Sequence, residues 1–140
     1  MITINQLREI SMRYLDSQSI GLIYMLKVLD EVITVDNETL VYPKNLYCRD
    51  TDLILYIFTS NYQFIKLTYD IEEVRLVTKD LRYLIKSEYK VAEEQHQLIL
   101  TFVDEEVILL HPKMDTTLPY VKEFNSQLLL ICRYLQEHSQ

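Results

Sequence analysis

The chain has 140 residues, of which 49% are hydrophobic and 25% charged, a composition that fits one folded domain and argues against intrinsic disorder. Its formal net charge of −7 argues against a broad nucleic-acid or anionic-membrane surface, because both need clustered Lys and Arg. The single glycine, Gly21, excludes glycine-rich nucleotide-binding loops and the Gly-x-Ser-x-Gly turn of many hydrolases. We find no repeat or linker and expect one domain over 1–140, with a helical segment at 1–30, antiparallel strands at 31–112 and a helix at 115–138.

The first part of the chain predicts helices. Thr3 and Gln6 have the spacing of a capping box, and a break or second cap is expected at residues 16–19. Apolar residues follow helical spacing on both sides of the break: Ile4, Leu7, Ile10 and Tyr14 before it, and Leu22, Met25, Leu26, Leu29 and Ile33 after it. The second run is rich in β-branched and aromatic residues, so the sequence leaves open whether residues 20–33 form a helix or a strand.

Strands are expected from residue 38 onward, where "ETLVY" predicts a short strand stopped by Pro43. Residues 53–59 and 62–69 flank Ser60-Asn61, which predicts a hairpin with a two-residue loop. Paired in this way, one face carries Ile54, Tyr56, Phe58, Ile65 and Leu67, and the other carries Leu53, Leu55, Ile57, Tyr62 and Phe64. Both faces are apolar, so we expect a cover on each side, from the N-terminal helices or from a second subunit.

Further strands are predicted at 73–79 and 81–91, although Leu84 and Ser87 break the alternation of the second. Residues 91–97 are predicted to form a polar loop. Residues 98–103 and 107–111 predict a last hairpin, in which Leu98, Leu100 and Phe102 face Val107 and Leu109 if Asp104-Glu105 forms the tip. A four-residue loop over 103–106 is the alternative, because Asp-Glu suits a tight turn poorly.

The C-terminal part predicts one long helix, capped by Thr116 or Thr117 and with Pro119 in its first turn. Its apolar stripe comprises Val121, Phe124, Leu128, Ile131 and Leu135, and Leu129, Leu130 and Cys132 widen it. Such a helix is suited to closing the open end of an antiparallel meander. The expected fold class is therefore α+β: an antiparallel roll or barrel of about seven strands, one or two N-terminal helices, and a capping C-terminal helix.

The order of elements over residues 39–137, together with "LILTFVDEEVILL" and "VKEFNSQLLLICRYL", resembles the pleckstrin-homology-like (PH-like) roll of small bacterial proteins of unassigned function. The helix-grip fold is the alternative, because it also places a long last helix over an antiparallel sheet. That fold needs a strand before its early helices, and "MIT" is too short to supply one.

Titratable residues give few candidate sites. His96 beside Glu93 and Glu94 would make a poor metal site without a second His or Cys, so a solvated loop is expected. His111 and Asp115 lie at a strand-to-helix junction, where a histidine can act as acid or base, yet the sequence supplies no nucleophile for them.

The cysteines, Cys48 and Cys132, are far apart and are expected to be reduced. Arg49 could lower the pKa of Cys48, but Asp50 and Asp52 offset it.

A candidate interaction surface is formed by two aromatic residues and a basic row: Tyr62, Phe64, Arg82, Lys86 and Lys90. PH-like domains that bind phosphoinositides use basic strands, but Glu88 interrupts this row and the net charge opposes an anionic ligand. Eleven tyrosines also favour protein contacts, because tyrosine offers a large amphipathic surface.

These features predict a cytoplasmic, non-enzymatic interaction or scaffold module that self-associates through the hairpin at 53–68. The alternative is a small-molecule carrier with an apolar cavity under the C-terminal helix. We expect no catalytic residues, metal, cofactor, nucleic-acid partner or transmembrane segment, and the partner itself is left open.

Overall fold

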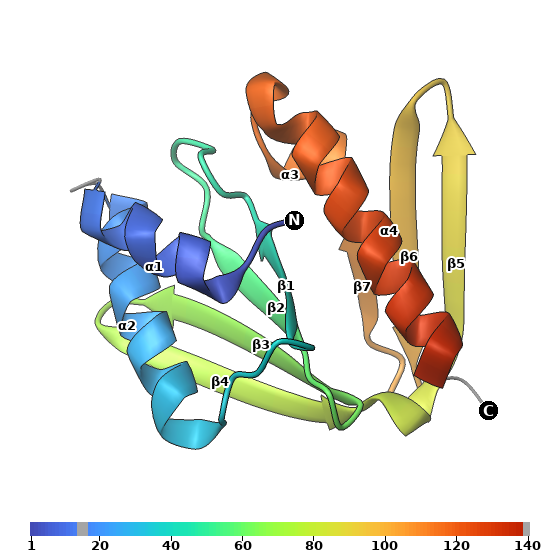
Figure 1. Cartoon of the computed structure of the whole chain (residues 1–140), viewed down its shortest axis with the longest axis horizontal. Helices are drawn as coiled ribbons and strands as arrows, with labels where there is room; N and C mark the ends of the chain where they lie inside the picture. The colour runs from blue at the N-terminus through green and yellow to red at the C-terminus, as the bar shows by residue number, and fades with distance from the viewer. Residues whose placement is uncertain (14–16, 139–140) are drawn as a thin grey trace.

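A computed structural model describes residues 1–13 and 17–138 (Figure 1). The helices are α1 (Ile4–Arg13), α2 (Ser17–Val32), α3 (Pro112–Asp115) and α4 (Val121–His138), with short 3₁₀ turns η1 (Leu81–Tyr83) and η2 (Leu118–Tyr120). The strands are β1 (Leu40–Lys44), β2 (Ile54–Phe58), β3 (Gln63–Asp70), β4 (Glu73–Asp80), β5 (Leu84–Ala92), β6 (Gln95–Phe102) and β7 (Val107–Leu110). The α+β class, the seven antiparallel strands and the terminal helices are confirmed.

The strands form two open sheets instead of one closed roll. One sheet has the order β1-β2-β3-β4 and the other the order β5-β6-β7. The chain leaves the first sheet through η1, where the Asp80 side chain accepts a hydrogen bond from the Arg82 backbone N–H and caps the turn. This turn ends β4 and starts β5 in a new sheet.

The two N-terminal helices form as the sequence predicts. Thr3 and Gln6 make both bonds of the capping box, with the Thr3 N–H donating to Gln6 Oε1 and the Gln6 N–H donating to Thr3 Oγ1. The open question over residues 20–33 is answered as helix, since α2 runs to Val32. Tyr14 and Asp16 lie outside the described residues.

The first sheet is covered on both faces within the monomer. Ile65 and Leu67 share the α2 face of β3 with Tyr69, whose ring would be 3.0 Å from a Cβ added at Gly21 of α2. Phe64 lies on the opposite face and packs against Phe102 of β6, with 5.5 Å between ring centroids. Both faces of the hairpin are buried, so the expected self-association through residues 53–68 has lost its basis.

The predicted registers of two hairpins are wrong by one residue, for the same reason. Phe58 pairs with Phe64 instead of Gln63, because the loop ends with Tyr62 in the left-handed region at φ 62°. Glu105 likewise ends the β6–β7 loop in the left-handed region, at φ 73°. Each loop therefore holds three residues, and the added residue exchanges the faces of the following strand. In the first hairpin, one face carries Leu55, Ile57, Ile65 and Leu67, and the opposite face carries Ile54, Tyr56, Phe58 and Phe64. In the last hairpin, one face carries Leu98, Leu100, Phe102, Ile108 and Leu110, and the opposite face carries Val107 and Leu109.

A β-bulge between Leu84 and Lys86 explains why Leu84 broke the predicted alternation of β5. Leu84 pairs with the buried Phe102, whereas Ile85 is left 64% exposed. The faces predicted for Leu84 and Ile85 are thus exchanged. The predicted polar loop at 91–97 is wrong as well, since β5 and β6 continue to a tight turn at Glu93-Glu94.

Two predicted boundaries also differ. Pro43 lies inside β1, which it can do because β1 is an edge strand and a proline needs no hydrogen-bonded N–H there. The last helix begins at Val121, after α3 and η2, and Pro119 lies in η2. Phe124, Leu128 and Ile131 of α4 are buried, but Leu129 is exposed, so the buried stripe is narrower than expected.

The β3–β4 turn gives a stability prediction. Ile71 lies at φ 46° and Glu72 at φ 62°, left-handed positions that a β-branched residue adopts at a cost. Because Ile71 is 88% exposed, its side chain adds little packing. Ile71→Asn is expected to raise the free energy of unfolding by about 1 kcal/mol, measured by urea denaturation. Val107→Asn, at an exposed strand position, is the control and should give no gain; a loss of stability in Ile71→Asn would contradict the account.

Candidate functional site

A buried polar cluster joins the first sheet to the α3 junction. The Asp115 carboxylate accepts hydrogen bonds from the Tyr42 hydroxyl (2.8 Å) and from the His111 backbone N–H (2.7 Å). Lys44 Nζ lies 3.2 Å from Asp115 Oδ1 and donates to the Leu109 carbonyl at 2.8 Å. Tyr42 and Lys44 come from β1, so this carboxylate ties two segments that are far apart in the sequence.

Electrostatics in the cluster favours the protonated form of its two tyrosines, Tyr42 and Tyr56. Burial, together with the nearby Asp115 carboxylate, raises the pKa of Tyr42 far above its usual value. Burial and the same carboxylate raise the pKa of Tyr56 to about 12. His111 Nδ1 is buried without a hydrogen-bond partner.

The sequence correctly placed His111 and Asp115 together at a strand-to-helix junction, but it missed Tyr42 and Lys44. Tyr42 is 73 positions from Asp115, and no local pattern links them. Each oxygen of Asp115 faces a donor of the protein, which is the arrangement of a structural connection between β1 and α3.

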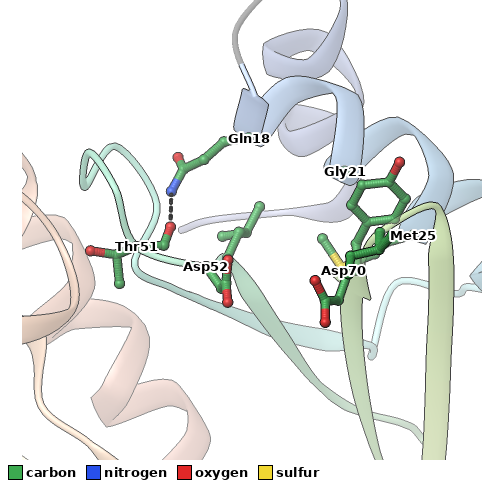
Figure 2. Close-up of a pocket in the computed structure, with 9 residues that line it drawn as sticks. Gln18, Gly21, Met25, Thr51, Asp52 and Asp70 are labelled. Atoms are coloured by element: carbon green, nitrogen blue, oxygen red, sulfur yellow. Dashed lines mark hydrogen bonds between the residues drawn. The ribbon is translucent and has the colours of Figure 1, made fainter.

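A second feature is a pocket of about 220 Å³ between α2, the β1–β2 loop and the β3–β4 turn (Figure 2). Gln18 lies at its rim, where its amide nitrogen donates to the carbonyls of Asn45, Cys48 and Thr51. Its carbonyl oxygen accepts the Tyr47 N–H. Gln18 therefore holds the β1–β2 loop against α2, and the pocket is the space left beside it.

The packing at the wall of this pocket explains why the single glycine of the chain lies at position 21. A Cβ there would lie 3.0 Å from Tyr69 Cδ1, and Tyr69 is stacked on Tyr24 with 5.6 Å between centroids. Gly21→Ala is expected to lower the free energy of unfolding by about 1 kcal/mol despite alanine's higher helix propensity. In a Tyr69→Ala background the same change should raise it by about 1 kcal/mol. Equal effects of Gly21→Ala in both backgrounds, measured by urea denaturation, would show that the ring of Tyr69 is not the reason why position 21 needs a glycine.

The five residues predicted as an interaction surface do not form one surface. Phe64 is only 1% exposed, and this part of the prediction is wrong because its face of the hairpin packs against Phe102 of β6. Tyr62 is half-buried and stacks on His138, with 5.4 Å between ring centroids. Arg82 is exposed but forms a bidentate pair with Asp80, which lowers the pKa of Asp80 to about 2.

Lys86 and Lys90 do lie together, on the outer face of β5. Their partners on β6 are Thr101 and Gln97, and Glu88 lies between them opposite Ile99. Within residues 1–13 and 17–138, none of the three charges of β5 takes part in an ion pair.

We call residues Leu84–Ala92 the β5 edge. β5 is the outermost strand of its sheet, and no element lies beyond it in Figure 1. Seven of its nine side chains are exposed. They include the apolar Ile85, Tyr89 and Val91, which are 64%, 37% and 55% exposed. No pattern in the sequence indicates this exposure, since periodicity does not distinguish an edge strand from a covered one.

The remaining candidates are isolated. His96 lies in β6, where its Nδ1 is 2.5 Å from the Tyr89 hydroxyl. Among the described residues there is no group of three His, Cys, Asp or Glu side chains that could hold a metal. Cys48 and Cys132 are free, and burial raises the pKa of both thiols. No helix of the described chain has the length and apolar character needed to cross a membrane.

A pocket of about 540 Å³ borders the C-terminal half of α4 and lies beside the helix instead of beneath it, and a smaller one of about 220 Å³ lies between α1 and the start of α4. Charged or polar side chains form much of the wall of the larger pocket, among them Glu38, Ser60, Arg133 and Glu137. Beneath α4 the space is filled by core side chains such as Leu128 and Ile131, neither of which is exposed. This arrangement does not favour the carrier alternative.

A family profile described as "Protein of unknown function (DUF3908)" matches residues 2–126, from the N-terminal segment into the first turns of α4. The chain belongs to the DUF3908 family. No match was found among curated proteins or among solved structures. The function of this DUF3908 chain must therefore be argued from its own surface.

Proposed function

We propose that this DUF3908 chain is a non-enzymatic protein-interaction module of PH-like architecture, and that the β5 edge binds an extended segment of a partner. The exposure of the β5 edge carries the proposal. The order of four strands, three strands and a C-terminal helix agrees with the PH-like resemblance. That resemblance extends to bacterial proteins, so we also place the chain in a bacterial cytoplasm, where its free cysteines would stay reduced.

An edge strand carries unpaired backbone N–H and C=O groups, which can hydrogen-bond an added strand. At the β5 edge, apolar side chains accompany these groups on both faces. The edge at β7 is less open, because Lys44 of β1 donates to the Leu109 carbonyl. The β5 edge is therefore the better place for an added strand.

The non-enzymatic part of the proposal rests on the Asp115 cluster. Asp115 is the one carboxylate among the buried side chains of the described residues, and its oxygens already interact with Tyr42, His111 and Lys44. A catalytic carboxylate needs an oxygen that can reach a substrate. We therefore infer that the Asp115 side chain stabilises the fold and takes no part in catalysis.

The proposal can be tested with a displayed library of random peptides. Peptides enriched on the protein would be titrated into isotope-labelled chain and mapped by NMR. We expect the perturbed amides to centre on residues 84–92 and the bound peptides to be extended.

Two variants make the test specific. Ile85→Lys combined with Val91→Lys should weaken peptide binding at least about tenfold, since both side chains flank the edge. Val77→Lys, at an exposed position of β4, should leave binding unchanged. Peptides that bind elsewhere, or a library that yields no binders, would reject the β5 edge as the binding element.

A further inference from the structure

The charge pattern of the β5 edge points to a specific partner strand. Lys86, Glu88 and Lys90 alternate along its outer face, and within the described chain none of them forms an ion pair. A strand that pairs well here places a negative side chain opposite a lysine of β5 and a positive side chain opposite Glu88. The partner can therefore be sought among strands with alternating charges.

β5 itself has the alternating charges that such a partner needs. Two copies of an edge strand related by a two-fold axis are antiparallel, and residues of like face lie opposite one another. With the axis at Tyr89, Glu88 of each copy lies opposite Lys90 of the other, so two opposite-charge pairs form. With the axis at Glu88, Lys86 would instead lie opposite Lys90, and Glu88 opposite itself.

We propose that the β5 edge pairs with the β5 edge of a second copy of this chain, with the two-fold axis at Tyr89. This inference rests on the proposed role of β5 as a binding strand and names its partner. The pairing joins two three-stranded sheets into one of six strands. It differs from the self-association predicted through residues 53–68, whose faces are buried.

The Tyr89 register also suits the backbone and the inner face. The ladder covers residues 86–92 and leaves the bulge between Leu84 and Lys86 outside it. A register centred on Ser87 would also pair Lys with Glu, but it would include the bulged Ile85. On the inner face, the 37% exposed Tyr89 packs on its symmetry mate, and Val91 covers Ser87 of the other copy.

Lysines and bulges are also devices that prevent edge pairing. Here the bulge lies at one end, and each lysine of the Glu88–Lys90 pairs meets a carboxylate instead of another lysine. A single strand pair buries little area, so the dimer is expected to be weak and concentration-dependent.

Sedimentation equilibrium from about 10 μM to about 1 mM tests the pairing. Wild type should dimerise reversibly. Glu88→Lys and Lys90→Glu should each weaken the dimer at least about tenfold, because each places like charges opposite one another. An equimolar mixture of the two variants should dimerise again, since both Lys–Glu pairs are restored between unlike chains.

Lys86→Glu is the matched control for the register. In the Tyr89 register Lys86 lies opposite Ala92, so this variant should dimerise as wild type does. If Lys86→Glu abolishes the dimer and Lys90→Glu does not, the axis is at Ser87 and the proposed register is wrong. If Glu88→Lys and Lys90→Glu both dimerise normally, the interface lies elsewhere.

A wild type that stays monomeric at the highest concentration overturns the second copy as partner. The binding role of β5 is judged separately, by the peptide experiment. Circular dichroism of each variant guards against misfolding, which none of these substitutions on a largely exposed strand should cause.

Discussion

Asp115→Ala is expected to lower the free energy of unfolding by about 3–5 kcal/mol, the largest loss we foresee from removing a polar side chain. Asp115 is 2% exposed and is the common acceptor for the Tyr42 hydroxyl and the His111 N–H. Removing it leaves both donors buried without an acceptor and Lys44 without its counter-ion. Urea denaturation followed by circular dichroism measures the loss.

Two variants separate the causes. Asp115→Asn keeps an acceptor oxygen and should cost less than Asp115→Ala. Lys44→Met should cost less again, because the carboxylate keeps its bonds from Tyr42 and His111 and the new side chain still covers the site. If the free energy of unfolding of Asp115→Ala is within about 0.5 kcal/mol of the wild-type value, the cluster does not hold β1 to α3.

Phe64→Ala is the second large prediction, with an expected loss of about 3–5 kcal/mol. The ring of Phe64 contacts Tyr56, Phe58 and Phe102, with centroids 5.6, 5.4 and 5.5 Å away. Its loss would leave a cavity where the first sheet packs on the second. Denaturant unfolding of the purified variant provides the value.

Phe64→Leu should retain much of this packing and cost about 1–1.5 kcal/mol. Ile85→Ala, at an exposed position, should change stability by less than about 0.5 kcal/mol. Were Phe64→Ala as stable as wild type, the interaction surface predicted from the sequence would regain Phe64, and the core described here would be wrong.

Periodicity predicted the strands and the helices α1 and α4, but it left the type of α2 open and did not predict α3. The 3–4 spacing predicted the first and the last helix, and alternation predicted the hairpins. What failed was register, because the left-handed positions that lengthen two loops are held by Tyr62 and Glu105 and not by glycine. With one glycine in the chain, the usual signal for such positions is missing.

The division into two sheets also had no local signal beyond η1, where Asp80 caps the turn between the strands predicted at 73–79 and 81–91. The misfit at Leu84 was a usable sign of the bulge, since an inserted residue moves its neighbour to the other face. Partners from distant segments, such as Tyr42 for Asp115, depend on tertiary structure. The exposure of β5 depends on it in the same way, because only the arrangement of the sheets makes it an edge.

Amide hydrogen exchange of residues 84–92, followed by NMR in dilute and in concentrated samples, tests the central claim that the β5 edge is open and takes an added strand. In an edge strand the amides alternate between those bonded to the neighbouring strand and those that point outward. We predict that in dilute solution alternate β5 amides exchange rapidly, and that these same amides slow when the protein is concentrated. Uniform protection of β5 in dilute solution, or slowing confined to another element, would contradict the account.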